Sequence, residues 1–284
     1  MDYLDIIIPA YNEEDNIAEV IKGVRRILGN SCRIIVVDDA SKDKTAEVAQ
    51  NNGAEVIQHP YRMGNGASIK TGLRKAKTEV VLLMDGDGQH KPSEIPHLLG
   101  QIHKFDMVIG ARNLSGFSFR NFANRFYNLF ASYVTQFRIL DLTCGFRLVK
   151  RGVALKFLYL LPNGFSYPST LTLAFLKTGR TINYVSVSSG LRRGGKSKIN
   201  LFSDGARFLI IIIRIATFFS PLRVFVPVSL LFFLSGLLYY LYTFIIFHRF
   251  TNMAVFLLTS SVLIFMLGLV SEQISQLRMD KTED

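Results

Sequence analysis

The sequence has no tryptophan, and Cys32 and Cys144 are the only cysteines among its 284 residues. They lie far apart and outside any CxxC spacing, which excludes a CxxC redox or zinc motif and favours two reduced, buried thiols in a cytosolic domain. The segment Met1–Ile8 has no basic region and only a very short apolar run. We therefore expect no secretory signal peptide, and an amino-terminal domain that stays in the compartment where it is made.

Acidic residues are scarce, because 22 Asp and Glu stand against 33 Lys and Arg, for a net charge of +11. This excess predicts an anionic partner: nucleic acid, a phosphorylated ligand or a membrane surface. No signature of a nucleic-acid-binding module is present. We therefore expect no nucleic acid partner, and assign the charge to phosphate ligands and a lipid bilayer.

Charge is almost absent between residues 222 and 274. Two apolar runs there, at about 222–247 and 253–271, predict two transmembrane helices within a segment 221–274. The first would be about 39 Å long, which exceeds the hydrocarbon core of about 30 Å. A short turn joins them, so we expect a hairpin, followed by a cytoplasmic tail at 275–284.

The segment 199–220 is apolar but interrupted by Arg207 and Arg214. This pattern favours an amphipathic helix lying in the membrane interface, and the alternative is a buried helix that closes the catalytic domain. Basic residues crowd the approach to the first span, whereas the turn of the hairpin holds Arg249 alone. This asymmetry predicts a catalytic domain on the cytoplasmic face of the membrane. The basic residues concerned are Arg192, Arg193, Lys196, Lys198, Arg207, Arg214 and Arg223.

Residues 1–198 alternate short apolar runs with amphipathic stretches, which predicts an α/β domain with a parallel sheet. Ligands of such sheets bind beyond the carboxyl ends of the strands. Four polar clusters follow the predicted strands Asp5–Ile8, Arg33–Val37, Glu79–Met84 and Met107–Ile109, so we expect them to meet at one edge. The clusters are Tyr11–Glu13, Asp38-Asp39, Asp85–Gln89 and Arg112.

The segment Asp85-Gly-Asp-Gly-Gln places two carboxylates one residue apart at a strand end. Mg²⁺ and Mn²⁺ favour such oxygen ligands and leave positions for phosphates and water. The alternative is an ordinary Asp-Gly turn. Asp38-Asp39 fits hydrogen bonding to a nucleotide, or capping of the next helix by Asp39 or Ser41.

Tyr11 fits packing against a nucleobase and Glu13 fits accepting a hydrogen bond from it, although Asn12 also fits the role of a helix cap. Further along, the basic loop Arg192-Arg-Gly-Gly-Lys-Ser-Lys suits phosphate binding. The alternative is a generic patch of charge beside the membrane. Arg112, Arg120 and Arg125 add further cations near the expected mouth of the site.

Several motifs together resemble family 2 glycosyltransferases, whose nucleotide-binding half has the GT-A fold, a Rossmann-like nucleotide-sugar-binding domain. They are Pro9-Ala-Tyr-Asn-Glu, Val36-Val-Asp-Asp-Ala-Ser and Asp85-Gly-Asp-Gly-Gln-His. More narrowly, the chain is similar to dolichyl-phosphate mannose synthases and bacterial polyprenyl-phosphate glycosyltransferases over residues 4–200. The supporting segments are Ile109-Gly-Ala-Arg, Asp141-Leu-Thr-Cys-Gly-Phe-Arg and the basic loop at 192–198.

The resemblance implies a role for each matching residue. Asp85, Asp87 and Gln89 would bind Mg²⁺ or Mn²⁺, with Asp87 as the first candidate for a direct ligand. The same three residues and Gly86 would hold the nucleotide-sugar together with Pro9, Tyr11, Glu13, Asp38 and Asp39. The acceptor phosphate would face Arg112, Arg125, Arg192, Ser197 and Lys198. The residues that the resemblance implies in catalysis are Asp87, Arg112, Arg192 and Lys198.

The implied reaction is inverting transfer of a sugar from GDP-mannose or a UDP-sugar to a polyprenyl or dolichyl phosphate. Two segments depart from the family pattern, because Gly164–Thr170 lacks an acid found in many relatives and Asp141-Leu-Thr-Cys lacks a common proline. One alternative is a processive polysaccharide synthase, but its Gln-x-x-Arg-Trp motif requires tryptophan. Another is an inactive nucleotide-sugar-binding membrane protein. The sequence does not determine which sugar is transferred, which nucleotide base the donor carries, or the oligomeric state.

Overall fold

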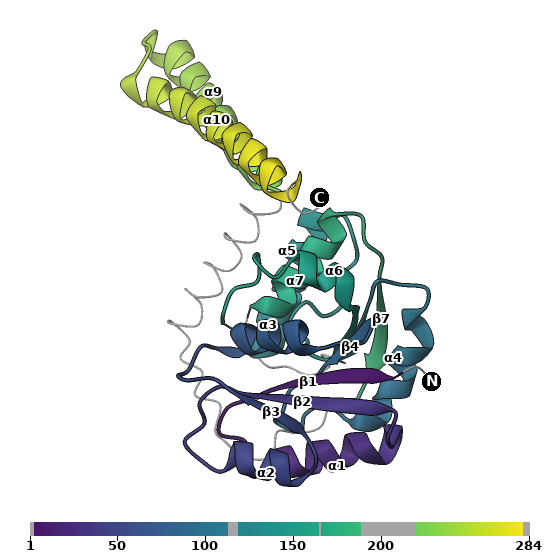
Figure 1. Cartoon of the computed structure of the whole chain (residues 1–284). Coiled ribbons are helices and arrows are strands. Elements are labelled where there is room, and N and C mark those ends of the chain that lie inside the picture. Colours follow the sequence, from purple (N-terminus) through teal and green to yellow (C-terminus); the bar gives the residue numbers. More distant parts are fainter. Residues whose placement is uncertain (1–2, 113–118, 165, 189–219, 281–284) are drawn as a thin grey trace. The chain divides into compact units, whose positions relative to one another are not determined.

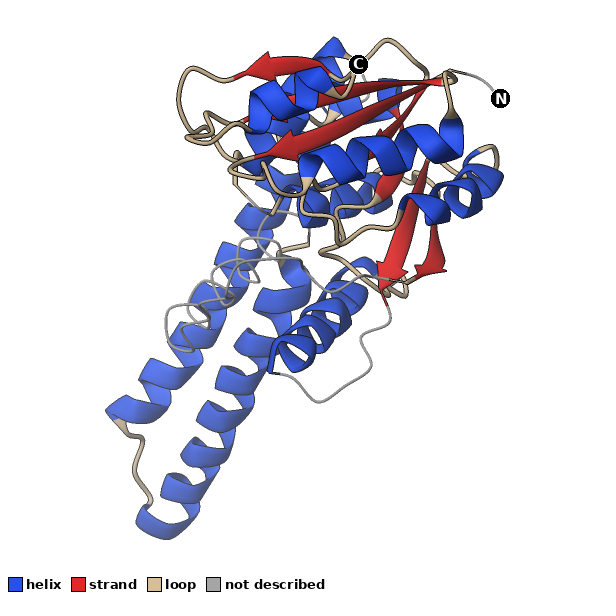
Figure 2. Cartoon of the chain, turned by 90° about the horizontal axis from the view of Figure 1, so that it is seen from below, coloured by secondary structure: helices blue, strands red, loops and turns tan. Residues whose placement is uncertain are grey.

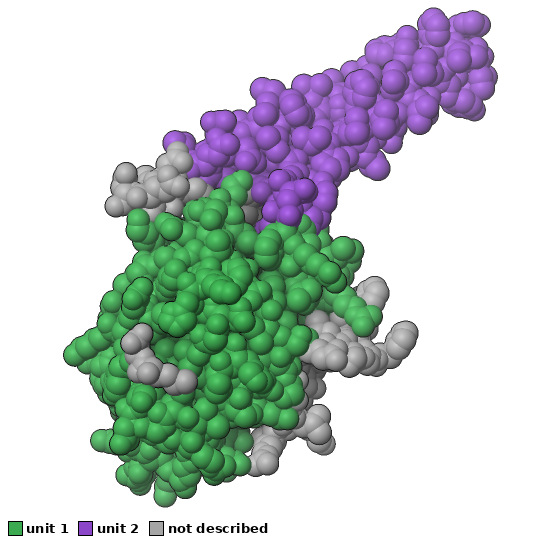
Figure 3. Space-filling view, turned by 90° about the vertical axis from the view of Figure 1, so that its right-hand side faces the viewer, with its two compact units in different colours: residues 1–132, 137–199 green, residues 133–136, 200–284 purple. Residues whose placement is uncertain are grey.

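The computed structural model describes residues 3–112, 119–164, 166–188 and 220–280. The chain forms two compact units, each described here by itself. The first comprises residues 1–132 and 137–199, and the second comprises residues 133–136 and 200–284 (Figure 3). The first unit contains the sheet, and the second contains two long helices (Figure 1).

The first unit is built on a seven-stranded sheet with the order β3-β2-β1-β4-β6-β5-β7. Six strands run in one direction, and β6 runs antiparallel between β4 and β5. The prediction of a wholly parallel sheet is therefore wrong at β6, a strand of four residues that is too short to show a direction or a period. The strands are β1 Leu4–Ala10, β2 Cys32–Asp38, β3 Glu55–Gln58, β4 Val80–Leu83, β5 Met107–Arg112, β6 Arg147–Lys150 and β7 Ile182–Val187.

Helices cover both faces of this sheet, because its central strands are apolar on both sides. Every residue of β1 is buried, as expected for a strand in the middle of a parallel arrangement. Figure 1 shows α1 and α2 on one side of β1 and β2, and α3 on the other. The helices of this unit are α1 Ile17–Leu28, α2 Thr45–Asn51, α3 Asn65–Lys75, α4 Ile95–Ile102 after the 3₁₀ turn Pro92–Glu94, α5 Phe119–Thr135, α6 Arg151–Lys156 and α7 Tyr167–Lys177.

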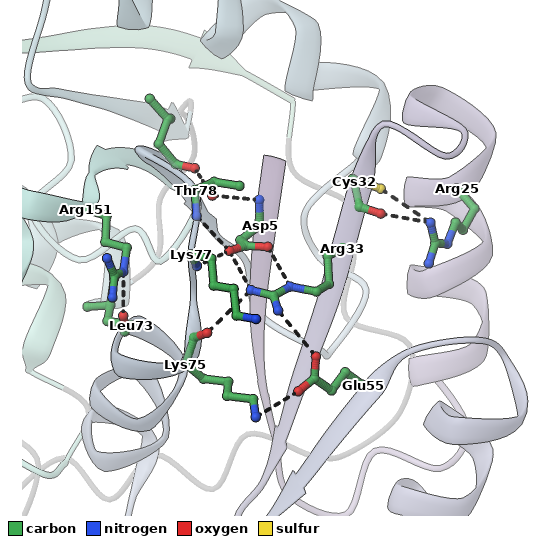
Figure 4. A network of polar contacts seen from close by, with 11 residues as sticks. Asp5, Arg25, Cys32, Arg33, Glu55, Leu73, Lys75, Lys77, Thr78 and Arg151 are labelled. Atoms are coloured by element: carbon green, nitrogen blue, oxygen red, sulfur yellow. Dashed lines mark hydrogen bonds and ion pairs between the residues drawn. The ribbon is translucent and has the colours of Figure 1, made fainter. Parts of the chain in front are cut away.

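A polar network fixes the amino-terminal edge of the sheet (Figure 4). Asp5, on β1, is fully buried. Its two carboxylate oxygens accept hydrogen bonds of 2.8 Å from Nε and Nη2 of Arg33 on β2. The backbone N–H groups of Lys77 and Thr78 also donate to it. The network therefore joins the starts of β1, β2 and β4, at the edge opposite their carboxyl ends.

The second unit contains α9 Leu222–Phe247 and α10 Asn252–Asp280, which run side by side (Figure 2). The first predicted span, 222–247, is confirmed as one helix. The second helix starts one residue before the predicted 253 and continues nine residues beyond the predicted end at 271. The predicted interfacial helix at 199–220 lies outside the described residues, apart from residue 220.

Both helices are long and apolar enough to span a bilayer, with mean hydropathies of 2.1 and 2.5 over their most apolar stretches. Only 11% and 17% of those stretches are buried, so most of their apolar surface is exposed, unlike the core helix of a soluble domain. Glycines allow the two helices to approach closely. A side chain at Gly236 would lie 3.0 Å from Leu257, and one at Gly268 would lie 2.6 Å from Phe225. Small residues commonly fill this role between membrane helices.

Candidate active site

The four predicted polar clusters follow strands that end at the same edge of the sheet. Ala10 at the end of β1 pairs with Asp38 at the end of β2. Leu83 at the end of β4 pairs with Arg147 of β6, which also pairs with Ile109 of β5. The carboxyl ends of β1, β2, β4 and β5 therefore lie at the same edge of the sheet, as the sequence predicted, although β4 ends at Leu83, opposite Ile7 and three residues before the end of β1.

The turns after β1 and β2 are bonded to each other. The N–H of Asn12 donates to Oγ of Ser41 at 2.9 Å, and the N–H of Lys42 donates to Oδ1 of Asn12 at 2.9 Å. The N–H of Glu13 donates to Oγ1 of Thr45 at 2.8 Å. The alternative in which Asn12 caps the first helix is wrong, because α1 starts only at residue 17 and Asn12 has a φ of 53°. Its side chain instead joins two loops of the candidate site.

The side chain of Asp39 is hydrogen-bonded to the loop that follows β3. Its carboxylate accepts hydrogen bonds of 2.8 Å from the backbone N–H groups of Met63 and Gly64. It also lies 2.8 Å from Nδ1 of His59, whose Nε2 lies 3.0 Å from the Thr71 hydroxyl. Burial alone would raise the Asp39 pKa, but these hydrogen bonds lower it below its usual value. Asp39 thus fixes the loop 59–64 at the sheet edge as an ionised carboxylate.

Neither Asp39 nor Ser41 caps the helix that follows β2, so that alternative is wrong. The helix α2 begins at Thr45, whose N–H donates to the side chain of Asp43 at 3.0 Å. Asp38 instead accepts hydrogen bonds from the hydroxyl and the N–H of Ser41. These bonds hold the turn after β2 in one conformation.

Arg62 is a residue of this edge that the motifs did not predict. Its guanidinium carbon lies 4.2 Å from the centroid of the Tyr11 ring, within range of a cation–π interaction. Arg62 is exposed, and the loop that carries it is fixed by Asp39. The cation of Arg62 therefore lies over the Tyr11 ring. Arg62 is 51 residues from Tyr11 in the sequence, so no local sequence pattern could predict their contact.

The side chains of Asp85 and Asp87, which follow β4, are accessible enough to contact a bound ion. The Asp85 side chain is 32% exposed, and Asp87 is half-buried, with its Oδ1 accepting the N–H of Gln89 at 3.1 Å. A Cβ on Gly145 would lie 2.6 Å from Oδ2 of Asp85, so the glycine leaves room for this carboxylate. Gly86 similarly lies against the backbone oxygen of Pro9, where a Cβ would be 3.3 Å away.

These residues fit a divalent cation. Burial raises the pKa of Asp85, and the Asp87 carboxylate adds to this, although His90 opposes it. A bound cation offsets both effects, since it favours the charged carboxylate. Within the described ranges, no group of three or more His, Cys, Asp or Glu side chains could hold a metal. Two carboxylates and an amide suit Mg²⁺ or Mn²⁺, which take phosphate and water oxygens as further ligands.

Three buried residues surround Asp85 from the interior. His90 is 6% exposed, its Nε2 lies 3.8 Å from Oδ2 of Asp85, and its ring packs on Phe146 at 5.1 Å. Burial lowers the His90 pKa and favours the neutral ring. Arg147 is fully buried and donates to the backbone oxygens of Cys144 and Pro168. The sequence placed these residues within motif segments but did not reveal what they contact.

Arg112 is held by an acid from another part of the chain. Its Nε and Nη2 donate to the two carboxylate oxygens of the buried Asp141 at 2.7 and 3.0 Å, and Nη2 also donates to Thr143 at 2.8 Å. Burial alone would lower the Arg112 pKa, but Asp141 raises it above its usual value. Arg112 is therefore a fixed cation in a set position.

The remaining predicted cations differ in what the structure describes of them. Arg125 is an exposed residue of α5. Arg192, Ser197 and Lys198 lie outside the described residues, and so does the side chain of Arg120.

The first turn of α3 is closed by the loop that precedes α7. The N–H groups of Gly66 and Ala67 donate to the backbone oxygens of Gly164 and Asn163 at 3.1 Å. A Cβ on Gly66 would lie 2.0 Å from the backbone oxygen of Pro162, so only glycine fits. The Gly164–Thr170 segment without the expected acid is thereby linked to the loop that Asp39 fixes.

This mixed sheet, with an acid pair beyond β4 and a second acidic turn beyond β2, is of the GT-A type that binds nucleotide-sugars. The chain belongs to glycosyl transferase family 2, whose profile matches residues 5–158, more than half of the sequence. A second profile, the GtrB C-terminal hairpin, matches residues 220–277. The motif-based resemblance to polyprenyl-phosphate glycosyltransferases is confirmed.

Curated relatives are about 30% identical to the chain over the residues that align. An uncharacterized protein of Methanocaldococcus jannaschii is 30% identical over 207 residues, which cover 64% of this chain and 86% of that protein. Undecaprenyl-phosphate 4-deoxy-4-formamido-L-arabinose transferase of Pseudomonas fluorescens is 30% identical over 162 residues, covering 53% of this chain and 47% of the transferase. The chain thus spans about half the length of that relative.

The fold is also that of solved glycosyltransferases. Glucosyl-3-phosphoglycerate synthase of Mycobacterium tuberculosis, crystallised with Mn²⁺, uridine diphosphate and phosphoglyceric acid, superimposes with a TM-score of 0.63 at 20% identity. The match covers 76% of this chain and 78% of the synthase. At this identity the likeness establishes the shared fold.

Proposed function

We propose that the protein transfers a sugar from a nucleotide-sugar to a polyprenyl phosphate, with inversion at the anomeric carbon. The observation that carries the proposal is the accessible Asp85–Asp87 pair at the carboxyl edge of a GT-A sheet, in a chain that also has an apolar helical hairpin. The relatives named undecaprenyl-phosphate 4-deoxy-4-formamido-L-arabinose transferase support a polyprenyl phosphate acceptor.

Asp85, Asp87 and Gln89 would hold the cation, Mg²⁺ or Mn²⁺. When bound, the cation neutralises charge on the diphosphate of the donor. Pro9, Glu13 and Asp39 would hold the nucleotide, with Asp38 beside them. Tyr11 would pack on its base.

In the proposed reaction, an oxygen of the lipid phosphate attacks the anomeric carbon. The bond from that carbon to the diphosphate breaks, and the nucleoside diphosphate leaves with its electron pair. The acceptor oxygen is already ionised at neutral pH, so no side chain has to remove a proton. Arg112, fixed by Asp141, would place and neutralise the anionic partners. Arg125, Arg192, Ser197 and Lys198 would bind the acceptor phosphate.

The division of the chain follows from this proposal. Residues 1–198 would form the catalytic domain, 199–220 an interfacial helix, 221–274 the membrane hairpin and 275–284 a tail. The catalytic domain would face the cytoplasm, where nucleotide-sugars and the phosphate head of the acceptor meet. The basic residues before the first span support this orientation.

The test is product formation by the purified full chain in detergent, with polyprenyl phosphate and a panel of radiolabelled UDP- and GDP-sugars. We expect label in an organic-extractable, acid-labile lipid when Mg²⁺ or Mn²⁺ is present, and none with EDTA. Asp87→Ala should reduce turnover by about 100-fold or more, the scale of losing one charge-stabilising group. Glu47→Ala, at an exposed site on α2, is the matched control and should be fully active.

Two outcomes would contradict the proposal. Near-normal turnover of a folded Asp87→Ala protein would remove the metal site from the account. Nucleotide-sugar binding without lipid labelling from any donor would favour a non-catalytic binding protein.

A further inference from the structure

The carboxylate of Asp39 has one hydrogen-bonding position left for a ligand. An ionised carboxylate offers about four acceptor positions, two on each oxygen. Within the described residues, Oδ1 accepts from the N–H of Met63 and from Nδ1 of His59, and Oδ2 accepts from the N–H of Gly64, each at 2.8 Å. These bonds fill Oδ1 and leave one position, on Oδ2.

His59 is itself held in the place from which it fills Oδ1. Its side chain is 6% exposed, and Nδ1 is the donor because the ionised carboxylate only accepts. On the other side of the ring, Nε2 lies 3.0 Å from the hydroxyl of Thr71 on α3. The imidazole therefore cannot turn away from Asp39 without losing a partner at each nitrogen.

The backbone on both sides of this pair is also fixed. The N–H of Asp39 donates to the backbone oxygen of Ala10, and the N–H of His59 donates to the backbone oxygen of Asp38, both at 2.9 Å. The Asp39 side chain is 5% exposed. Since neither partner is free to move, the carboxylate is not able to present both oxygens to a ligand.

The two donor classes considered for this chain, UDP-sugars and GDP-mannose, differ in the N–H groups of their bases. The pairing edge of uracil has a single N–H, at N3, between two carbonyl acceptors. The pairing edge of guanine has two adjacent donors, N1–H and the 2-amino group, which together require two acceptor positions. One position on Asp39 satisfies uracil and leaves a guanine donor unpaired, which costs affinity in a buried site.

We propose that Asp39, with its Oδ1 occupied by His59, selects a uridine nucleotide over a guanosine nucleotide, so that the sugar donor is a UDP-sugar. The proposal rests on the function put forward above, in which Asp39 holds the nucleotide. His59 acts here as a positioning residue. It does not touch the base, but it determines how many hydrogen bonds the carboxylate can accept from it.

The test measures UDP and GDP affinities by isothermal titration calorimetry, using the full chain in detergent with Mn²⁺. We expect UDP to bind at least about 10-fold more tightly than GDP, the scale of one unpaired donor. The ratio of the two affinities is the readout, because a general loss of packing weakens both nucleotides alike.

Variants of His59 test its part in this selection. His59→Ala removes the donor and frees a position on Oδ1, so the ratio of UDP to GDP affinity should fall about 10-fold. His59→Asn keeps an N–H donor and should retain most of the preference for UDP. Thr71→Val is the matched control, since it removes only the outer hydrogen bond to Nε2 and should leave the ratio unchanged. Circular dichroism would establish that each variant is folded.

Three results would overturn the inference. GDP binding as tight as UDP binding, or tighter, would refute it alone and leave the nucleotide site intact. An unchanged ratio in a folded His59→Ala protein would show that His59 does not control the selection. Binding of neither nucleotide by the unmodified chain would refute the proposed function and the inference together.

Discussion

Asp39 and Asp85 lie at the same edge of the sheet, after strands separated only by β1, and their surroundings differ. Asp39 is 4% exposed and bonded to two backbone N–H groups and an imidazole, and its pKa is lowered. Asp85 is partly exposed, has a glycine beside it, and has a raised pKa. The Asp39 carboxylate is therefore held in place by its bonds to the fold, whereas the Asp85 carboxylate has room to move; the nucleotide-binding role of Asp39 stays a prediction.

Gly145→Ala is predicted to disturb this second acid. The new Cβ would lie 2.6 Å from Oδ2 of Asp85, so the carboxylate has to move. We expect Mn²⁺ affinity to fall at least about 10-fold, as for changes that misorient a metal ligand. Gly152→Ala is the control, because a Cβ there meets nothing within 4 Å. Equal Mn²⁺ affinities of the two folded variants, measured by calorimetry, would argue against the assigned position of Asp85.

For single residues, the sequence patterns predicted the position in the fold better than the side-chain contacts. The location of Asp85 and Asp87 at a strand end is confirmed, because an apolar run followed by Asp-Gly marks a strand and its turn. Their ligand roles stay predictions. The Arg112–Asp141 pair joins residues 29 apart across the fold, and no local period records such a pairing. Asn12 was misread because a capping residue and a loop-bridging residue look alike in sequence.

Among the elements, segments with a clear apolar pattern were predictable, including the four-residue β4, whereas β7 and the 17-residue α5 were not predicted. The buried face of α1 is confirmed, because Ile17, Val20, Ile21, Val24 and Leu28 repeat at helical spacing. The strands β3 and β6 have four residues each and escaped prediction. The antiparallel direction of β6 depends on where the chain returns after α5. That is decided by packing and not by the four residues themselves.

The network that joins β1, β2 and β4 predicts a pH-dependent stability. Burial would raise the Asp5 pKa, but hydrogen bonds from Arg33 and two backbone N–H groups lower it overall. The unfolded chain therefore takes up a proton at higher pH than the folded chain. The stability from Asp5 is fully present above its unfolded pKa of about 4 and is lost as pH falls through the lower folded value.

Asp5→Asn should then lower the free energy of unfolding by about 3 kcal/mol at pH 7, since it removes the buried carboxylate that pairs with Arg33 and leaves that arginine only the more distant Glu55. The difference from the unmodified chain should begin to shrink below about pH 4, where the unfolded chain takes up the proton, and should shrink further as pH falls through the lower folded pKa of Asp5. Urea unfolding followed by circular dichroism would measure both. Glu55→Gln, at the exposed end of the network, should cost less than about 1 kcal/mol. A pH-independent difference for Asp5→Asn would contradict this explanation.

Across the whole molecule, two units of opposite surface character share one chain. Hydropathy located the hairpin because the run is long and nearly free of charge. The pattern missed the end of α10, which continues to Asp280, because hydropathy marks where apolar side chains stop and not where backbone hydrogen bonding stops. The sidedness of the hairpin stays a prediction from the basic residues before it.

Labelling of single introduced cysteines tests that sidedness. In intact cells, an impermeant maleimide should label Thr251→Cys, in the turn between α9 and α10, and should label Glu47→Cys, on α2, only after permeabilisation. The native Cys32 and Cys144 are buried, so their background should be low. Labelling of Glu47→Cys in intact cells would place the catalytic domain outside.

The attachment of the loop 59–64 to Asp39 has a consequence for engineering. The ring of His59 and the backbone N–H groups of Met63 and Gly64 all bind the same carboxylate, so the loop is fastened at both ends. Between the two anchors, Tyr61 and Arg62 are exposed. A library that varies residues 60–62 and keeps the anchors would therefore preserve the scaffold while changing the surface next to Tyr11. If the nucleobase packs on Tyr11 as proposed, such a library would select for transferases that accept a different base.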